Sequence, residues 1–219
     1  MSTRAADYVD AIQRLPDGAA LAFHDVTWDE CAQVLQDLHN HRGLRTIYDR
    51  GRLEIVSPLS QHQDSARFID RLLQVLTDEL DLTFQAYGSA TWKSKALGKG
   101  AEANGCFYIE NAGRVIGRNN IDLESDPPPD IVLEIDLTNE SSRKFSIYAA
   151  LLVPEIWHYN DNVVRFFTLS SGSYVEASAS RRIPVLRPGR LTAALEVNKK
   201  EGQTAALRAF RNHLRESAG

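Results

Sequence analysis

Apolar residues recur at helical spacing in several stretches of the chain. Between residues 61 and 80 they lie three or four positions apart, which gathers them on one face of a helix. Upstream, Thr27 and Glu30 have the spacing of a capping box, in which each side chain binds the other residue's backbone N–H, so a helix should follow through about His39. Other helical patterns predict a short helix and an approach segment within 1–25, and helices over 141–152 and 202–217.

Alternating and fully apolar runs, bounded by turn residues, predict the strands. One hairpin is expected around Asp49-Arg50-Gly51, where the glycine supplies the positive φ of the turn. A second hairpin is expected around Ser171-Gly172. In chain order the predicted strands are 44–48, 53–56, 83–87, 90–94, 101–110, 130–137, 155–159, 163–169 and 173–176.

The order of these elements indicates an α/β (α+β) fold, in which helices flank a mixed β-sheet core with an added β-hairpin. The strand, helix and strand over 130–159 form a βαβ unit, whose two strands should be parallel. We expect a single domain over 1–219. It would comprise the N-terminal helix and approach segment in 1–25, the core in 26–180, and a C-terminal extension and helix in 181–219.

Composition narrows the class of protein without changing this picture. With 29 acidic and 25 basic residues the net charge is −4, which argues against a broad basic coat for nucleic acid but not against a local groove. No apolar run reaches 18 residues, and the N-terminus lacks the continuous apolar run of a signal peptide. Cys31 and Cys106 are too few for a zinc site or a disulfide framework. We therefore expect a cytoplasmic protein that does not enter a membrane.

The strand over 130–137 carries an unusual number of carboxylates. Because strand side chains alternate between faces, Asp130, Glu134 and Asp136 share one face, and the apolar residues 131, 133 and 135 share the other. The polar face can simply lie in water. If it is buried, carboxylates need a partner or a cation, and clustered oxygen ligands suit Mg²⁺ or Mn²⁺.

Lys144 lies on the helix that follows this strand. A lysine at the start of such a helix can lean back over the end of the strand and bring a positive charge to the carboxylates. It can also be an ordinary solvated helix lysine, which is the commoner situation.

The stretch PPPDIVLEIDLTNESSRKFSIYAALLVPEIWHYN, residues 127–160, resembles the signature of the Uma-type restriction endonuclease family, which is similar to the PD-(D/E)XK nuclease superfamily. The segments LEIVSPLSQHQ and GKGAEANGCFYIEN also resemble family segments, so the similarity spans roughly residues 20–180. It implies a restriction-endonuclease-like core and a nuclease-like single domain. The residues that fit the family pattern are Pro129, Asp130, Glu134, Lys144, Tyr148, Val153, Pro154, Glu155 and Trp157.

The resemblance also implies a function and a site. Nucleases of this superfamily hold a divalent metal with an Asp and an Asp or Glu on neighbouring strands, and a nearby Lys orients or activates water. By resemblance, Glu134 takes the second acidic position and Lys144 the place of the lysine, with Asp130 as a further catalytic residue and metal ligand. The expected cofactor is Mg²⁺ or Mn²⁺, the expected partner is DNA, and a homodimer would serve to cut both strands of a duplex.

Asn104 departs from the family pattern, because it stands where a metal-binding Asp is expected. Its amide oxygen can still ligate a hard cation but adds no negative charge, so either the affinity for Mg²⁺ is weaker or Glu102 and Asp130 supply the missing charge. This position supports an alternative function, a catalytically impaired nuclease fold that acts as a binding or assembly module. Asn104-Gly105 can also be a plain turn.

Two further positions are candidates for a supporting role, by resemblance to the superfamily. Glu54 lies on the strand before SPLSQHQ, and His62 lies near the start of the following helix, where it would contact phosphate or water. A surface or capping role is the simpler interpretation of His62. Lysines 93, 95 and 99, with Trp92 as a stacking platform, either line a nucleic-acid groove or belong to a solvated loop.

Overall fold

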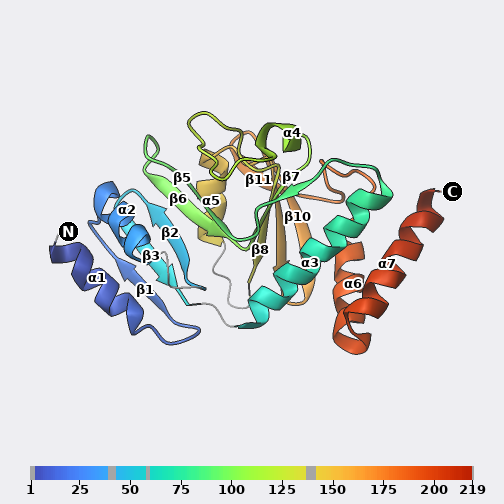
Figure 1. The fold of residues 1–219 in the computed structure, drawn as a ribbon, viewed down its shortest axis with the longest axis horizontal. Helices are drawn as coiled ribbons and strands as arrows, with labels where there is room; N and C mark the ends of the chain where they lie inside the picture. The colour runs from blue at the N-terminus through green and yellow to red at the C-terminus, as the bar shows by residue number, and fades with distance from the viewer. Residues whose placement is uncertain (1–2, 39–42, 58–59, 137–141, 219) are drawn as a thin grey trace. The chain divides into compact units, whose positions relative to one another are not determined.

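The structure is a computed structural model of the chain and describes residues 3–38, 43–57, 60–136 and 142–218, without the side chains of 3, 60–63, 142, 217 and 218 (Figure 1). The chain divides into two compact units, each described by itself below. The first unit contains Met1–Ser60 and Thr91–Glu102, and the second contains Gln61–Ala90 and Ala103–Gly219. A single domain over the whole chain stays a prediction.

The first unit is built on a five-stranded sheet with the order β1-β3-β2-β6-β5. The expected hairpin is present, because β2 and β3 pair antiparallel around the turn at Arg50 and Gly51. The expected capping box at Thr27 and Glu30 is also present and opens α2. The elements are α1 (Thr3–Gln13), β1 (Ala20–Phe23), α2 (Trp28–Asp37), β2 (Arg45–Asp49), β3 (Arg52–Val56), β5 (Ala90–Ser94) and β6 (Lys99–Ala103), the last residue of which falls in the second unit.

The second unit is built on a six-stranded mixed sheet with the order β11-β10-β9-β8-β7-β4. Strands β8 and β9 are parallel and are joined through α5, as the βαβ prediction required, and the other pairs are antiparallel. The strands are β4 (Gln85–Ala86), β7 (Gly105–Tyr108), β8 (Ile131–Ile135), β9 (Glu155–Asn160), β10 (Val163–Ser170) and β11 (Ser173–Ala177). The helices are α3 (Ser60–Glu79), α4 (Ala112–Val115), α5 (Ser142–Ala150), α6 (Pro188–Glu201) and α7 (Gln203–Ala218).

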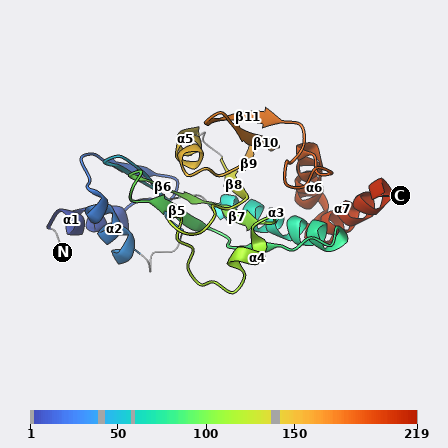
Figure 2. The same ribbon diagram turned by 90° about the horizontal axis from the view of Figure 1, so that it is seen from above.

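The two faces of β8 are covered by different helices. Ile131, Leu133 and Ile135 belong to a buried apolar cluster that also contains the inner face of α3. In Figure 2, α3 and α5 lie on opposite sides of β8. The face with the carboxylates is therefore turned toward α5, and the alternation predicted from the sequence is confirmed.

The fold class is confirmed, and the differences concern particular segments. The single strand expected over 101–110 was wrong, because the chain leaves one sheet and enters the other at Asn104, between β6 and β7. The approach segment contains β1, and helix α6 was not expected. Pro188 opens α6 at a position where the missing N–H of proline costs nothing. The predicted element ends His39, Leu137 and Ser141 lie outside the described residues.

Candidate functional site

Glu134 is the centre of the candidate site in the second unit. It lies on β8, it has no exposed surface, and both oxygens of its carboxylate are engaged. Lys144 Nζ lies 2.8 Å from Oε2, and the Tyr148 hydroxyl donates to Oε1 at 2.5 Å. The face of β8 that carries Glu134 is thus buried, and the possibility that it lies in water was wrong.

Helix α5 brings both partners to Glu134. Lys144 and Tyr148 are four residues apart, which places them one above the other on the same helix face. Both are buried, with Lys144 only 5% exposed. The interpretation of Lys144 as a solvated helix lysine was therefore wrong. Tyr148 fits the family pattern, but its hydrogen bond to Glu134 was not predicted. The four-residue spacing between Lys144 and Tyr148 is the sequence feature that could have predicted it.

Asn104 lies beside the same stretch of β8. Its backbone N–H donates to the Leu133 carbonyl at 3.0 Å, and its side-chain Oδ1 accepts the Ile135 N–H at 3.1 Å. The amide oxygen therefore holds the end of β8 at the point where the chain passes from β6 to β7. Asn104 is 8% exposed, so this is a buried junction rather than a plain surface turn.

Asp130 has a different set of partners at the other end of β8. Its Oδ2 accepts the backbone N–H groups of Ile109 and Asn111 at 2.8 and 3.0 Å, and its Oδ1 accepts the Asn111 side-chain amide at 2.8 Å. Four residues of extended strand separate the backbone positions of Asp130 and Glu134 by about 13 Å. The structure therefore does not bring these two carboxylates together. The hydrogen bonds of Asp130 instead hold the segment after β7 in place.

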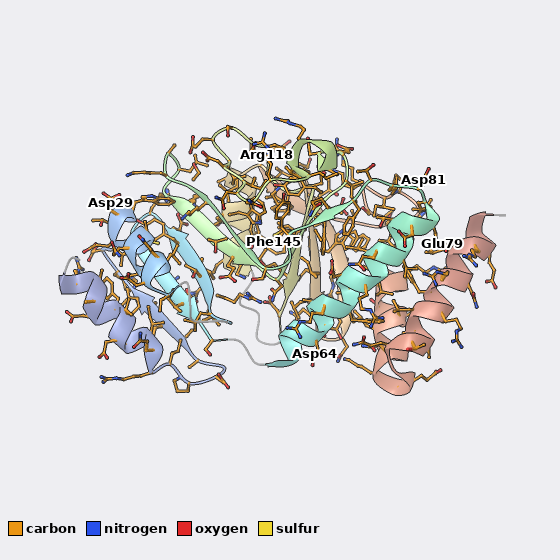
Figure 3. All side chains as sticks on the ribbon, viewed as in Figure 1. Asp29, Asp64, Glu79, Asp81, Arg118 and Phe145 are labelled. Atoms are coloured by element: carbon orange, nitrogen blue, oxygen red, sulfur yellow. The ribbon has the colours of Figure 1, made fainter. Side chains whose placement is uncertain are left out.

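Asp136 and His158 form a second buried pair on the α5 side of the sheet. Oδ2 of Asp136 lies 2.9 Å from Nε2 of His158. His158 lies opposite Glu134 in the backbone register of β8 and β9. The imidazole packs edge-to-face on Phe145 of α5, at 5.7 Å between ring centroids; Phe145 is labelled in Figure 3. Sequence reasoning noted Asp136 but not its partner, because a contact across strands needs the register of β8 and β9.

A cavity of about 430 Å³ opens beside Asp136. Asp136 and Tyr159 line it from the carboxyl ends of the two parallel strands, where open α/β sheets commonly bind ligands. Asp64 of α3 and Lys199 of α6 line other walls, and the Lys199 ammonium lies 5.7 Å from the centre of the Tyr159 ring. The second unit thus has space for a ligand close to the strand that carries Glu134.

Glu54 and Glu102, two of the expected supporting residues, belong to the first unit and have arginine partners there. Glu54 Oε2 lies 2.7 Å from Arg52 Nη1, and Glu102 Oε1 lies 2.6 Å from Arg45 Nη1. His62 belongs to α3, but its side chain is outside the described residues. The contributions of all three to a site with Glu134 stay predictions.

The lysines near Trp92 do not form a stacking groove, which was one of the two alternatives for this segment. Trp92 is 3% exposed, so its ring is not available as a platform. Lys95 and Lys99 pair with Asp29 and Asp49 at 3.0 and 2.7 Å. Trp92 is therefore a packing residue of the first unit, and Lys93 is exposed.

The last helix docks on the core, as its amphipathic pattern indicates. Phe210 is buried in the apolar cluster of the second unit. Arg211 and Arg215 pair with Glu79 at the end of α3, and Figure 3 labels Glu79 where α3 faces α7. Two of the cations on this helix thus serve to attach it.

The described donors do not fit a divalent ion as they are arranged. Among residues 3–38, 43–57, 60–136 and 142–218, no group of three or more His, Cys, Asp or Glu side chains is placed to hold a metal. At Glu134 itself, an ammonium and a phenol occupy the two carboxylate oxygens, and the oxygen of Asn104 is bound to a backbone N–H. A divalent ion at Glu134 would have to share Oε2 with Lys144 or replace it.

A mixed sheet with a buried carboxylate–lysine pair beside its parallel strands is the arrangement expected of restriction-endonuclease-like proteins. Residues 28–199 match a family described as "Uma2: Putative restriction endonuclease". Because this match covers most of the chain, the chain belongs to that family. Restriction-endonuclease-like proteins generally use divalent metals.

Among the solved structures that are similar to the chain is a nuclease described as "putative" and as belonging to DUF820, from Anabaena variabilis. The two share 12% sequence identity, the similarity covers 68% of this chain and 89% of the other, and the TM-score is 0.44. A search of curated proteins found no match. In the described part of the chain, no helix has both the length and the apolar character needed to cross a membrane.

Proposed function

We propose that this chain is an endonuclease that hydrolyses phosphodiester bonds in DNA, and that Glu134 and Lys144 carry the reaction. The observation that supports this proposal is the 2.8 Å contact between the Glu134 carboxylate and the Lys144 ammonium, in a chain whose family is described as "Putative restriction endonuclease". Dependence on Mg²⁺ or Mn²⁺ is part of the proposal and comes from the family.

The proposed chemistry assigns a role to each residue of the pair. Hydrolysis of a phosphodiester increases the negative charge on the phosphate oxygens, and an ammonium aimed at them stabilises that charge. Lys144 is the cation closest to Glu134 in the described contacts of the second unit, and its long stem lets the ammonium turn from Glu134 to a phosphate. Glu134, once relieved of Lys144, is a carboxylate that can orient an attacking water and accept its proton.

A positioning role is proposed for Tyr148. Its hydroxyl stays on Oε1 of Glu134 while Oε2 faces Lys144, so the carboxylate keeps one orientation. A divalent ion, when bound, would lower the pKa of water and neutralise phosphate charge. Because the described donors do not fit such an ion as arranged, no step of the proposed mechanism passes through it.

The second candidate is a catalytically impaired nuclease fold that binds DNA or assembles with other proteins. The observation that favours it is Asn104, whose neutral amide stands in place of an expected carboxylate and is already bound to Ile135 N–H. In this case Glu134 and Lys144 would be a stabilising pair only.

The experiment that separates the two candidates is a cleavage assay with purified protein on supercoiled, linear and single-stranded DNA in Mg²⁺ and in Mn²⁺. We expect nicking that requires the metal and is lost in Glu134→Ala. Glu196→Ala, which removes an exposed carboxylate from α6, is the matched control and should cleave like the wild type. If the wild type cleaves none of these substrates with either metal, the endonuclease proposal fails and the impaired fold is favoured.

The homodimer and the cytoplasmic location stay predictions within this proposal. A two-fold pair of sites would cut both strands of a duplex. Sedimentation velocity with and without a DNA duplex tests this point, and a monomer under both conditions would contradict it.

A further inference from the structure

The cavity beside Asp136 has no part in the proposed reaction. Its volume of about 430 Å³ is in the range of small-molecule sites, and all of its described lining residues belong to the second unit. The most buried of these residues are Asp136, Tyr159 and Leu195. The others come from the start of α3, where Figure 3 labels Asp64, from the turn after β9, and from α6. The cavity is therefore large enough to hold a small molecule.

The charges around this cavity favour a cationic ligand. Asp64, Asp136 and Asp161 line it, whereas Lys199 is the only cation among its described lining residues. Asp136 is engaged by His158. Within the described part of the chain, neither Asp64 nor Asp161 has a hydrogen bond or an ion pair through its side chain. Because the lining carries a net negative charge, it repels a phosphate and attracts a molecule with several positive charges.

Lys199 shows which kind of cation the Tyr159 ring accepts. Its ammonium lies 5.7 Å from the centre of that ring and donates a hydrogen bond to Oδ1 of Asn162. An ammonium within about 6 Å of the centre of an aromatic ring is attracted by the electrons of the ring. Because Lys199 is exposed and its ammonium is carried on a flexible stem, another alkylammonium can take its place on the ring.

From these contacts we infer that the cavity binds an aliphatic polyamine, a flexible methylene chain that carries two or more ammonium groups. Asp64 and Asp161 attract the ammonium groups, and the Tyr159 ring accepts one of them in place of Lys199. A lysine side chain of another protein has the same chemistry but only one ammonium group, so the two carboxylates without partners favour the polyamine. This site lies outside the proposed reaction and does not depend on it.

The first measurement needs no variant. The whole protein is titrated with spermidine, with butylamine and with the amide of acetylated lysine by isothermal titration calorimetry at low ionic strength, where charges are least screened. We expect spermidine to bind at least ten-fold more tightly than either molecule with a single ammonium group. Equal affinities for the three, or tighter binding of the lysine amide, would overturn the inference.

The second measurement removes the carboxylates one at a time. Asp64→Asn and Asp161→Asn should each lower the spermidine affinity at least five-fold. Asp81→Asn is the matched control, because Asp81 is also exposed, does not line the cavity, and has a positive φ of 52°, close to the 51° of Asp161. Figure 3 labels Asp64 and Asp81 near opposite ends of α3. Unchanged affinity in either cavity variant, or an equal loss in Asp81→Asn, would overturn the inference.

A third measurement tests the place of Lys199. Lys199→Gln clears the Tyr159 ring and removes a like charge, so it should raise the spermidine affinity at least three-fold. Lys200→Gln, which removes an exposed neighbouring lysine that does not line the cavity, should change the affinity much less. All of these substitutions are at exposed side chains, and circular dichroism verifies that each variant folds. If Lys199→Gln binds spermidine no better than Lys200→Gln, the inference fails, whether or not the protein cleaves DNA.

Discussion

Oδ2 of Asp136 lies 2.9 Å from Nε2 of His158, although the two residues belong to segments that are more than twenty positions apart in the chain. Both side chains are largely buried, at 5% and 14% exposure. The pair lies on the same side of the sheet as Glu134, whose register partner on β9 is His158. A buried polar pair of this kind is worth more than a surface ion pair, because each partner would otherwise be desolvated without compensation.

We therefore expect Asp136 and His158 to be energetically coupled. A double-mutant cycle with Asp136→Asn and His158→Gln, measured by urea denaturation, should give a coupling free energy of about 1–3 kcal/mol. The control is the exposed pair of Asp10 on α1 and Arg14 just after its end, with 61% and 77% exposure, which should give at most about 0.5 kcal/mol. Additive effects of the two buried substitutions would contradict the prediction.

Removal of the Tyr148 hydroxyl should destabilise the protein. Tyr148→Phe keeps the ring in the core but takes the donor from Oε1 of a buried carboxylate, which should cost about 1.5–3 kcal/mol. Tyr174→Phe is the matched control, because the Tyr174 hydroxyl donates to a neutral acceptor, the Val153 carbonyl, at 2.7 Å. Its loss should cost about 0.5–1.5 kcal/mol. Equal costs in thermal or urea unfolding would show that the charge on Glu134 does not strengthen the bond.

Local signals were sufficient to predict most of the fold. The capping box at Thr27, the turn at Gly51 and the βαβ pattern over 130–159 each depend on residues close in sequence, and the structure confirms all three. The break at Asn104 was not predictable in this way, because it depends on hydrogen bonds to Leu133 and Ile135, about thirty residues away.

The same distinction applies to the candidate site. Glu134 and Lys144 were found together because they lie on one strand–helix unit, so their contact follows from topology. The alternation of carboxylates along β8 did not indicate that Asp130 accepts hydrogen bonds from the backbone of Ile109 and Asn111. This contact depends on where the segment after β7 runs beside the sheet. Alternation along a strand tells which residues share a face. It does not bring Asp130 and Glu134 to the same ion, because four residues of extended strand separate them by about 13 Å.

Glu155 should make stability depend on pH. It has no exposed surface, and burial raises its pKa above the ordinary value of 4.5, although hydrogen bonds from the Trp157 indole and from backbone N–H groups partly oppose this shift. The native state therefore holds the proton more tightly than the unfolded chain. Between the unfolded and the raised native pKa, folding takes up protons at this group, so its contribution to stability is present at low pH and is lost as the pH rises through that interval.

The measurement is the free energy of unfolding of the wild type and of Glu155→Gln between pH 4 and pH 7. We expect the wild type to lose stability relative to Glu155→Gln as the pH rises from about 4.5. The exposed residue Glu196, changed to Gln in the same way, is the control and should show no such trend. A difference that is constant over this range, or that grows in favour of the wild type, would contradict the prediction.

The two thiols should be protected in the folded protein. Burial raises the pKa of Cys31 to about 11, and Cys106 lies in β7 with no exposed surface, so very little reactive thiolate is accessible at either position. At pH 8 we expect an aromatic disulfide reagent to modify neither cysteine on the time scale in which it modifies both in urea. Cys31→Ser and Cys106→Ser, compared one at a time, assign any residual reaction to a position. Fast modification of either thiol without denaturant would show that its surroundings open on that time scale, and would contradict the burial on which the prediction rests.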